Sequence, residues 1–100
     1  MPSRLSHSAA LILKALSLGY RFGFEVMEIT GLPSGTVYPA LRRLERDELL
    51  TSQWEAEAEV NGSGRPARRY YEITSQGKAA ALAATDRYPL LARLLPEKHT

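Results

Sequence analysis

The feature that most limits how this chain can fold is a very short connection, Gly31 to Pro33, between two segments with helical patterns. The segment before it, 23–30, is predicted to be a short helix that Gly31 ends. Pro33 prevents that helix from continuing, because its ring fixes its own backbone and restricts the residue before it. Two helices joined this tightly cannot lie as a long antiparallel hairpin, so the pattern predicts a crossed helix-turn-helix.

The helix after this connection has the clearest pattern in the chain. Ser34 is predicted to be its N-cap, and its end is placed at Leu49 and Leu50. Pro39 is tolerated because it lies near the start, where backbone N–H groups lack helical partners in any case. One face carries apolar side chains at helical spacing, namely Val37, Ala40, Leu41 and Leu44.

Two further elements are predicted on either side of this pair of helices. An apolar pattern at residues 8–19 indicates a first helix, which Ser6 or Ser8 can cap. After the third helix the period changes, and residues 51–60 and 68–74 flank a loop rich in Asn, Gly and Pro. The second of these segments is rich in strand-forming residues, so a β-hairpin is predicted.

A last helix is predicted from Ser75, with a kink or break near Pro89. The order of elements gives the fold class α+β, mainly α: a winged helix-turn-helix with a three-helix core, a two-stranded β-wing and a C-terminal helix. In such folds the third helix enters the DNA major groove and the wing touches the backbone or the minor groove. We expect residues 1–74 to bind DNA and residues 75–100 to dimerise, within one compact unit.

Composition excludes several classes of function. The 100 residues include no cysteine, which rules out a disulfide framework and a thiolate metal site. The two histidines, His7 and His99, lie too far apart in sequence to form a ligand pair with metal-binding spacing, so we expect no metal and no cofactor. No cluster of nucleophile, base or metal ligand suggests an enzyme. No apolar run is long enough to span a membrane and no signal peptide is evident, so a cytoplasmic location is expected.

The net charge of +2 does not by itself indicate a nucleic-acid-binding protein, but the positions of the charges along the chain are informative. Residues 51–60 hold three glutamates and no base, whereas residues 61–70 hold Arg65, Arg68 and Arg69 and no acid. Such a wing suits a phosphate backbone. The alternative is that Arg68 and Arg69 pair with glutamates across the hairpin. That pairing is less expected for Arg65, which stands in the loop.

The start and outer face of the third helix are the other candidate DNA contacts. Free backbone N–H groups at Ser34, Gly35 and Thr36 can attract phosphate. Arg42 and Arg43 can reach phosphates or base edges, as can Arg46.

Four aromatic residues are candidates for packing or contact: Tyr38, Trp54, Tyr70 and Tyr71. The Tyr38 hydroxyl can contact a phosphate, or its ring can pack on the second helix. Trp54 is expected to pack in the core or hairpin. Of Tyr70 and Tyr71, which alternate along a strand, one is expected in the core.

Two stretches together resemble the PadR-like transcriptional regulators. Ser34-Gly35-Thr36-Val37-Tyr38-Pro39-Ala40-Leu41-Arg42-Arg43-Leu44-Glu45 is similar to the recognition-helix signature of that family, and Gly64-Arg65-Pro66-Ala67-Arg68-Arg69-Tyr70-Tyr71-Glu72-Ile73-Thr74 to its wing strand. The resemblance covers about residues 9–80 and is closest to a compact subgroup. It implies a bacterial regulator, usually a repressor, that binds palindromic promoter DNA as a homodimer. The implied DNA-binding residues are Ser34, Gly35, Thr36, Tyr38, Pro39, Arg42, Arg43, Arg65, Arg68 and Arg69.

The resemblance also implies that the C-terminal helix makes most of the dimer contact. The residues available for it are Leu82, Tyr88, Leu90, Leu91, Leu94 and Leu95. The alternative is that these side chains pack on the first helix of the same chain. In some compact relatives, tryptophans of the C-terminal helix bind flat aromatic drugs, but the single tryptophan here is Trp54, so that feature does not carry over and no effector can be named. The rival function is a winged-helix protein–protein interaction module without DNA binding.

Overall fold

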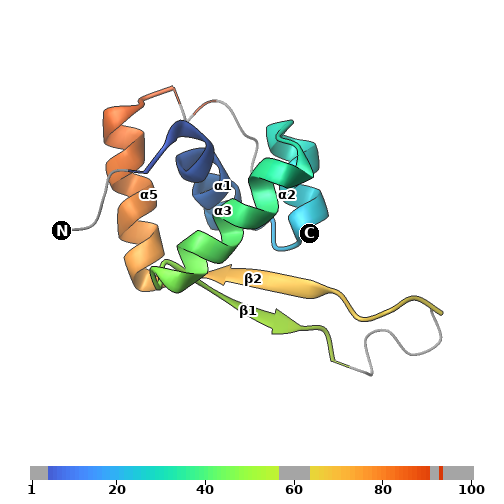
Figure 1. Cartoon of the computed structure of the whole chain (residues 1–100). Helices are drawn as coiled ribbons and strands as arrows, with labels where there is room; N and C mark the ends of the chain where they lie inside the picture. Colours follow the sequence, from blue (N-terminus) through green and yellow to red (C-terminus); the bar gives the residue numbers. More distant parts are fainter. Residues whose placement is uncertain (1–4, 57–63, 91–92, 94–100) are drawn as a thin grey trace.

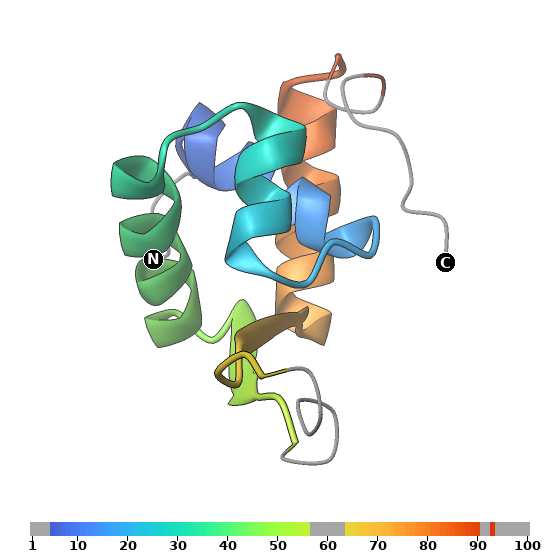
Figure 2. The same cartoon turned by 90° about the vertical axis from the view of Figure 1, so that its right-hand side faces the viewer.

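The computed structural model describes residues 5–56, 64–90 and 93 and forms a helical body with a projecting hairpin (Figure 1). In the turned view of Figure 2, α2 lies in front of α5, α3 runs down the left side, and the hairpin lies below. This is the predicted winged helix-turn-helix. The elements in chain order are α1 (His7–Ser17), α2 (Gly23–Thr30), α3 (Ser34–Arg46), β1 (Leu50–Trp54), β2 (Arg69–Ile73) and α5 (Ser75–Arg87).

Several predicted helix ends are confirmed. The Ser6 hydroxyl accepts a hydrogen bond from the Ala9 N–H at 3.1 Å, so Ser6 caps α1, which ends at Ser17, two residues before the predicted end. Gly31 ends α2 in the left-handed conformation, with φ of 74°, which glycine adopts without steric cost. The last helix begins at Ser75 and ends at Arg87, just before Pro89, as expected.

Both predicted ends of α3 are wrong by a small amount. The N-cap is Pro33 rather than Ser34, which is the first helical residue, and Pro33 offers no side-chain cap. The helix ends at Arg46 because the chain turns at Glu48, which has a φ of 64°, and Leu50 already belongs to β1. A left-handed residue cannot continue a right-handed helix.

The core lies between α1, α2, α3 and the base of the hairpin. Val26 of α2 and the predicted apolar face of α3 close on α1, with Ala40 only half-buried. Tyr71 is the core tyrosine and Tyr70 lies on the opposite face of β2. The largest buried side chains are Ile12, Leu13, Leu16, Val26, Val37, Leu41, Leu44, Leu50 and Tyr71.

The hairpin is antiparallel, and within the described residues its first strand ends at Trp54 and its second begins at Arg69. Its register pairs Leu50 with Ile73 at the base and Trp54 with Arg69 at the outer end, and residues 57–63 lie outside the described part. The segment before α2 extends the sheet, because the Tyr71 N–H donates to the Arg21 carbonyl at 2.8 Å. Of the two placements expected for Trp54, in the core or in the hairpin, the core placement is wrong, because the residue is 63% exposed, and its ring instead meets Arg69 across the hairpin. No helix within the described residues is long and apolar enough to cross a membrane.

A glycine allows α5 to begin directly against the turn between α3 and β1. A Cβ atom built on Gly77 would lie 1.9 Å from the Leu49 carbonyl oxygen and 2.6 Å from a side-chain carbon of Ile73. The Leu49 carbonyl also accepts a hydrogen bond from the Thr74 N–H at 3.1 Å, so neither side can withdraw easily. Only a residue without a Cβ fits here.

We therefore predict that Gly77→Ala lowers the free energy of unfolding by about 2–3 kcal/mol, as overpacking against rigid backbone does. Gly35→Ala is the matched control, because nothing lies within 4 Å of a Cβ at Gly35 in α3. Alanine is the better helix former by about 1 kcal/mol, so the control should be neutral or more stable. Urea denaturation of both variants tests this, and equal stabilities would contradict the close approach.

Candidate nucleic-acid interface

The outer face of α3 carries a row of arginines. Arg42, Arg43 and Arg46 are all exposed, and within residues 5–56, 64–90 and 93 none of them makes an ion pair. The opposite face of the same helix is buried through Val37, Leu41 and Leu44, and this fixes the direction in which the arginines point. The prediction that these arginines lie on the outer faces of the helix is confirmed.

The beginning of α3 is open to solvent. Ser34, Gly35 and Pro39 are exposed. The N–H groups of Thr36 and Val37 both donate to the Pro33 carbonyl, at 2.9 and 3.0 Å, so the expectation of a free N–H at Thr36 is wrong. Because Pro33 supplies no side-chain cap, the partial positive charge of the helix start is not neutralised by a capping oxygen. An anion can approach it from solvent.

Tyr38 packs on the preceding helix. A Cβ atom built on Gly23, the first residue of α2, would lie 2.5 Å from the Tyr38 ring and 2.7 Å from its hydroxyl oxygen. The packing alternative for Tyr38 is therefore confirmed, with glycine at position 23 making room for the ring. The residue remains 37% exposed, so contact with a ligand is still open to it.

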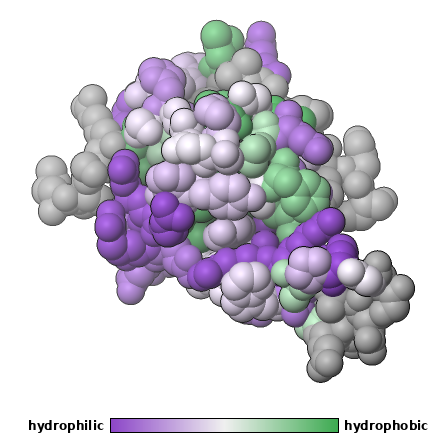
Figure 3. Space-filling view, turned by 45° about the vertical axis from the view of Figure 1, so that its right-hand side comes forward, coloured by the Kyte–Doolittle hydropathy of each residue, from purple (hydrophilic) through white to green (hydrophobic). Residues whose placement is uncertain are grey.

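A groove of about 410 Å³ separates α3 from the wing. Figure 3 shows hydrophilic residues gathering on the lower part of the molecule and continuing toward the wing. Within the part of the chain that the structure describes, three arginines and one carboxylate line the groove, and their net charge is positive. Its lining residues are Tyr38, Arg42, Glu45, Arg46, Arg69 and Tyr71.

One carboxylate ties the wing to α3. Glu45 accepts a hydrogen bond from the Ser52 hydroxyl at 2.6 Å and lies 3.6 Å from the Arg69 guanidinium. The same hydroxyl accepts two hydrogen bonds from Arg69, from Nε at 2.9 Å and from Nη2 at 2.6 Å. The ion-pair partner of Arg69 is thus on α3, whereas the cross-hairpin alternative placed it among the glutamates of the first strand. These three side chains connect the wing to α3.

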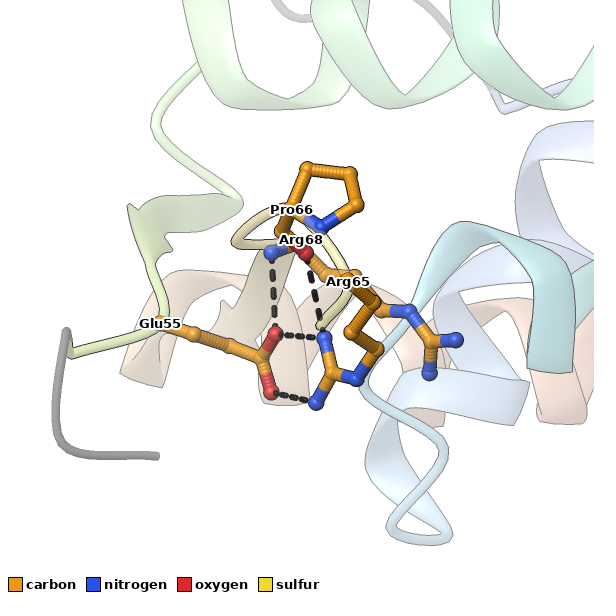
Figure 4. A network of polar contacts seen from close by, with 4 residues as sticks. All are labelled: Glu55, Arg65, Pro66 and Arg68. Carbon is orange, nitrogen blue, oxygen red and sulfur yellow. Dashed lines mark hydrogen bonds and ion pairs between the residues drawn. The ribbon is translucent and has the colours of Figure 1, made fainter. Parts of the chain in front are cut away.

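A second carboxylate organises the outer part of the wing, shown in Figure 4. Glu55 forms a two-pronged ion pair with Arg65, at 2.6 and 3.0 Å, and accepts the Arg68 backbone N–H at 2.9 Å. The expectation that Arg65 would be less engaged across the hairpin than Arg68 and Arg69 is wrong. The guanidinium of Arg68 instead lies 4.9 Å from the ring centre of Phe24 on α2. In the described residues, no cluster of three metal-ligating side chains accompanies these groups.

Comparison with protein families identifies the family to which the chain belongs. The model of the "Transcriptional regulator PadR-like family" matches residues 12–84, which include α3, the wing and most of α5. The chain belongs to this family. No protein with curated annotation matches the PadR-like chain.

Solved structures similar to the PadR-like chain share its fold. A PadR family transcription regulator from Clostridium difficile R20291 is 25% identical with a TM-score of 0.72, over 88% of this chain and 93% of that one. BpsR of Bordetella bronchiseptica, whose DNA binding is regulated by 6-hydroxynicotinic acid, is 18% identical with a TM-score of 0.70, over 93% and 67%. A PadR-like transcription factor from Bacteroides fragilis is 21% identical with a TM-score of 0.61, over 86% of each chain.

The structure adds supporting residues to the interface that the sequence suggested for this PadR-like protein. The sequence alone assigns no role to Glu45, Ser52 or Gly23, because their contacts depend on how the wing and α2 pack against α3. The alternation of Glu55 with its neighbouring glutamates did suggest pairing across the hairpin, but it could not identify the arginine. Which arginine pairs with Glu55 depends on the register of the hairpin, and the register cannot be derived from the charges alone.

The ion pair of Glu55 has a measurable consequence for its acidity. Hydrogen bonds from Arg65 lower the pKa of the Glu55 carboxyl from 4.5 to about 2, and the Arg68 N–H contributes to the same shift. A carboxyl that is more acidic in the folded chain stabilises the fold when ionised. This stabilisation is complete above about pH 4.5 and is lost as the pH falls toward 2.

We predict that Arg65→Gln raises the Glu55 pKa back toward 4.5, although not fully, because the Arg68 N–H remains. Carboxyl ¹³C chemical shifts followed by NMR through an acid titration measure it directly. Arg87→Gln, at the far end of α5, is the control and should leave the pKa of Glu55 low. A wild-type value near 4.5 would mean that the pair does not form in solution.

Proposed function

We propose that this PadR-like protein is a sequence-specific DNA-binding transcriptional regulator, a repressor that binds palindromic promoter DNA as a homodimer. The observation that carries the proposal is the arginine face of α3, whose three guanidinium groups are exposed and make no ion pair within the described residues, beside a groove that continues onto the wing. Free arginines are suited to phosphates and to guanine edges because they present donors in a fork.

In this proposal, α3 enters the major groove and the wing follows the adjacent backbone. Arg42 and Arg43 reach bases or phosphates, and the open start of α3 at Ser34 and Gly35 receives a phosphate. Thr36, Tyr38 and Pro39 follow along the same helix. Arg65, Arg68 and Arg69 belong to the wing contact. The contacts of Glu45 support the assignment of α3 and the wing to one DNA duplex, because they link the two elements.

Self-association would use the C-terminal part of the chain, so that residues 1–74 bind DNA and residues 75–100 dimerise. Leu82 and Leu90 support this, because they are 68% and 67% exposed and so have little contact inside their own chain. Tyr88 is half-buried and its ring centre lies 4.0 Å from that of His7, so it borders the proposed surface and also contacts α1. Leu91, Leu94 and Leu95 lie outside the described residues. Two-fold symmetry would place two α3 helices about one turn of DNA apart.

The DNA contact is tested by Arg42→Ala. We expect it to weaken binding of a duplex from upstream of the protein's own gene by about 1–3 kcal/mol. If Arg42 contacts a phosphate, the slope of log K against log salt also falls by about 1. Fluorescence anisotropy of labelled DNA at several salt concentrations gives both quantities. Arg87→Ala on α5 removes the same charge away from the groove and should change neither. A folded dimer that binds no DNA at low salt would favour the protein–protein interaction module instead.

The dimer contact is tested by Leu82→Arg. A charge placed in an apolar interface is costly to desolvate, so the variant should dissociate to monomers at concentrations where the wild type is dimeric. Sedimentation equilibrium measures the change in mass. Thr51→Arg, an exposed substitution on β1, is the control and should remain a dimer. A dimeric Leu82→Arg variant would remove α5 from the interface.

A further inference from the structure

The least expected surface residue of the wing is Trp54. It is the only tryptophan in the sequence, it ends β1, and it is 63% exposed. A large aromatic side chain left in water at the edge of a binding groove needs a reason, because its burial stabilises any contact that covers it. The core does not supply that contact.

The register of the hairpin places Trp54 on the groove side of the wing. Trp54 pairs with Arg69, and two residues earlier Ser52 pairs with Tyr71. Side chains alternate along a strand, so these four share one face of the sheet. Arg69 and Tyr71 line the groove opposite the arginines of α3, and Trp54 therefore lies at its outer end.

Arg69 covers only part of the indole. The guanidinium carbon lies 5.7 Å from the ring centre, and the same guanidinium is held by Ser52 and Glu45. The pair therefore combines an apolar ring with a fixed positive charge. A nucleic-acid backbone has the complementary pattern, since apolar sugar faces alternate with anionic phosphates.

We propose that Trp54 contacts the DNA backbone directly, packing the ring surface left open by Arg69 on a deoxyribose whose neighbouring phosphate Arg69 meets. This rests on the proposed function and adds a residue to it. The occupant is DNA because the surface is continuous with the arginine-lined groove. The indole N–H can donate to a phosphate oxygen in the same position.

The single tryptophan makes the contact directly observable. Titrating the protein with its upstream duplex should change the Trp54 emission and lower its quenching by acrylamide, with the same midpoint as the anisotropy of labelled DNA. The double variant Trp54→Phe with Gln53→Trp moves the indole to the neighbouring position on the opposite face of β1, where Gln53 is exposed. Emission from that variant should not respond to DNA that it still binds.

Affinity gives a second, independent readout. Trp54→Ala should weaken DNA binding by about tenfold, as the loss of a buried apolar contact of this size does, and Trp54→Phe should lose less. Gln53→Ala is the control and should bind like the wild type. Circular dichroism should show all of them folded, because both side chains lie at the surface.

The outcomes separate the two proposals. Anisotropy that reports DNA binding, with unchanged tryptophan emission or with Trp54→Ala at wild-type affinity, would overturn the role of Trp54 and leave the regulator intact. A folded wild-type protein that binds no DNA at low salt would instead overturn the proposed function on which this inference depends.

Discussion

The arrangement of the molecule depends on the close approach of α5 to the turn that ends α3. Gly77 sits against the Leu49 carbonyl, the Thr74 N–H donates to the same oxygen, and the Thr74 hydroxyl donates to the Glu48 carbonyl at 2.8 Å. The end of α3, the start of β1 and the start of α5 therefore meet within a few residues. Any rotation of α5 would move the turn, and with it both the helix and the strand that leave it.

A second constraint joins the two parts of the proposed interface. Among the described residues, Glu45 is the only acid that lines the groove, and removing it would raise the positive charge there. It is nevertheless well placed, because it accepts from Ser52 and approaches Arg69, both on the wing. Glu45 thus lowers the attraction of the groove for phosphate, and at the same time it links the wing to α3. A rigid two-part surface is better suited to select one DNA geometry than a more basic, mobile one.

Most of the fold could be predicted from local signals. The turn at Gly31 to Pro33, the apolar face of α3 and the shift to strand-forming residues each act over a few positions, and each was confirmed. The errors have two sources, one in interactions across the chain and one in a local backbone conformation. A tryptophan is usually buried, but the register of the hairpin places Trp54 at the outer end of β1, beyond the core. The end of α3 was missed because Glu48, not a glycine, adopts the left-handed conformation that stops the helix.

The pairing of Arg65 with Glu55 bears on how strongly salt should affect any DNA complex. A free arginine that meets a phosphate displaces a condensed cation from the DNA, and such displaced cations give the complex its salt dependence. Arg65 already pairs with the Glu55 carboxylate. If Arg65 moved to a phosphate, it would exchange one anion for another and leave the charge of Glu55 facing the DNA. The number of arginines on the wing therefore overstates the net release of ions. The wing would add shape to recognition more than it adds charge.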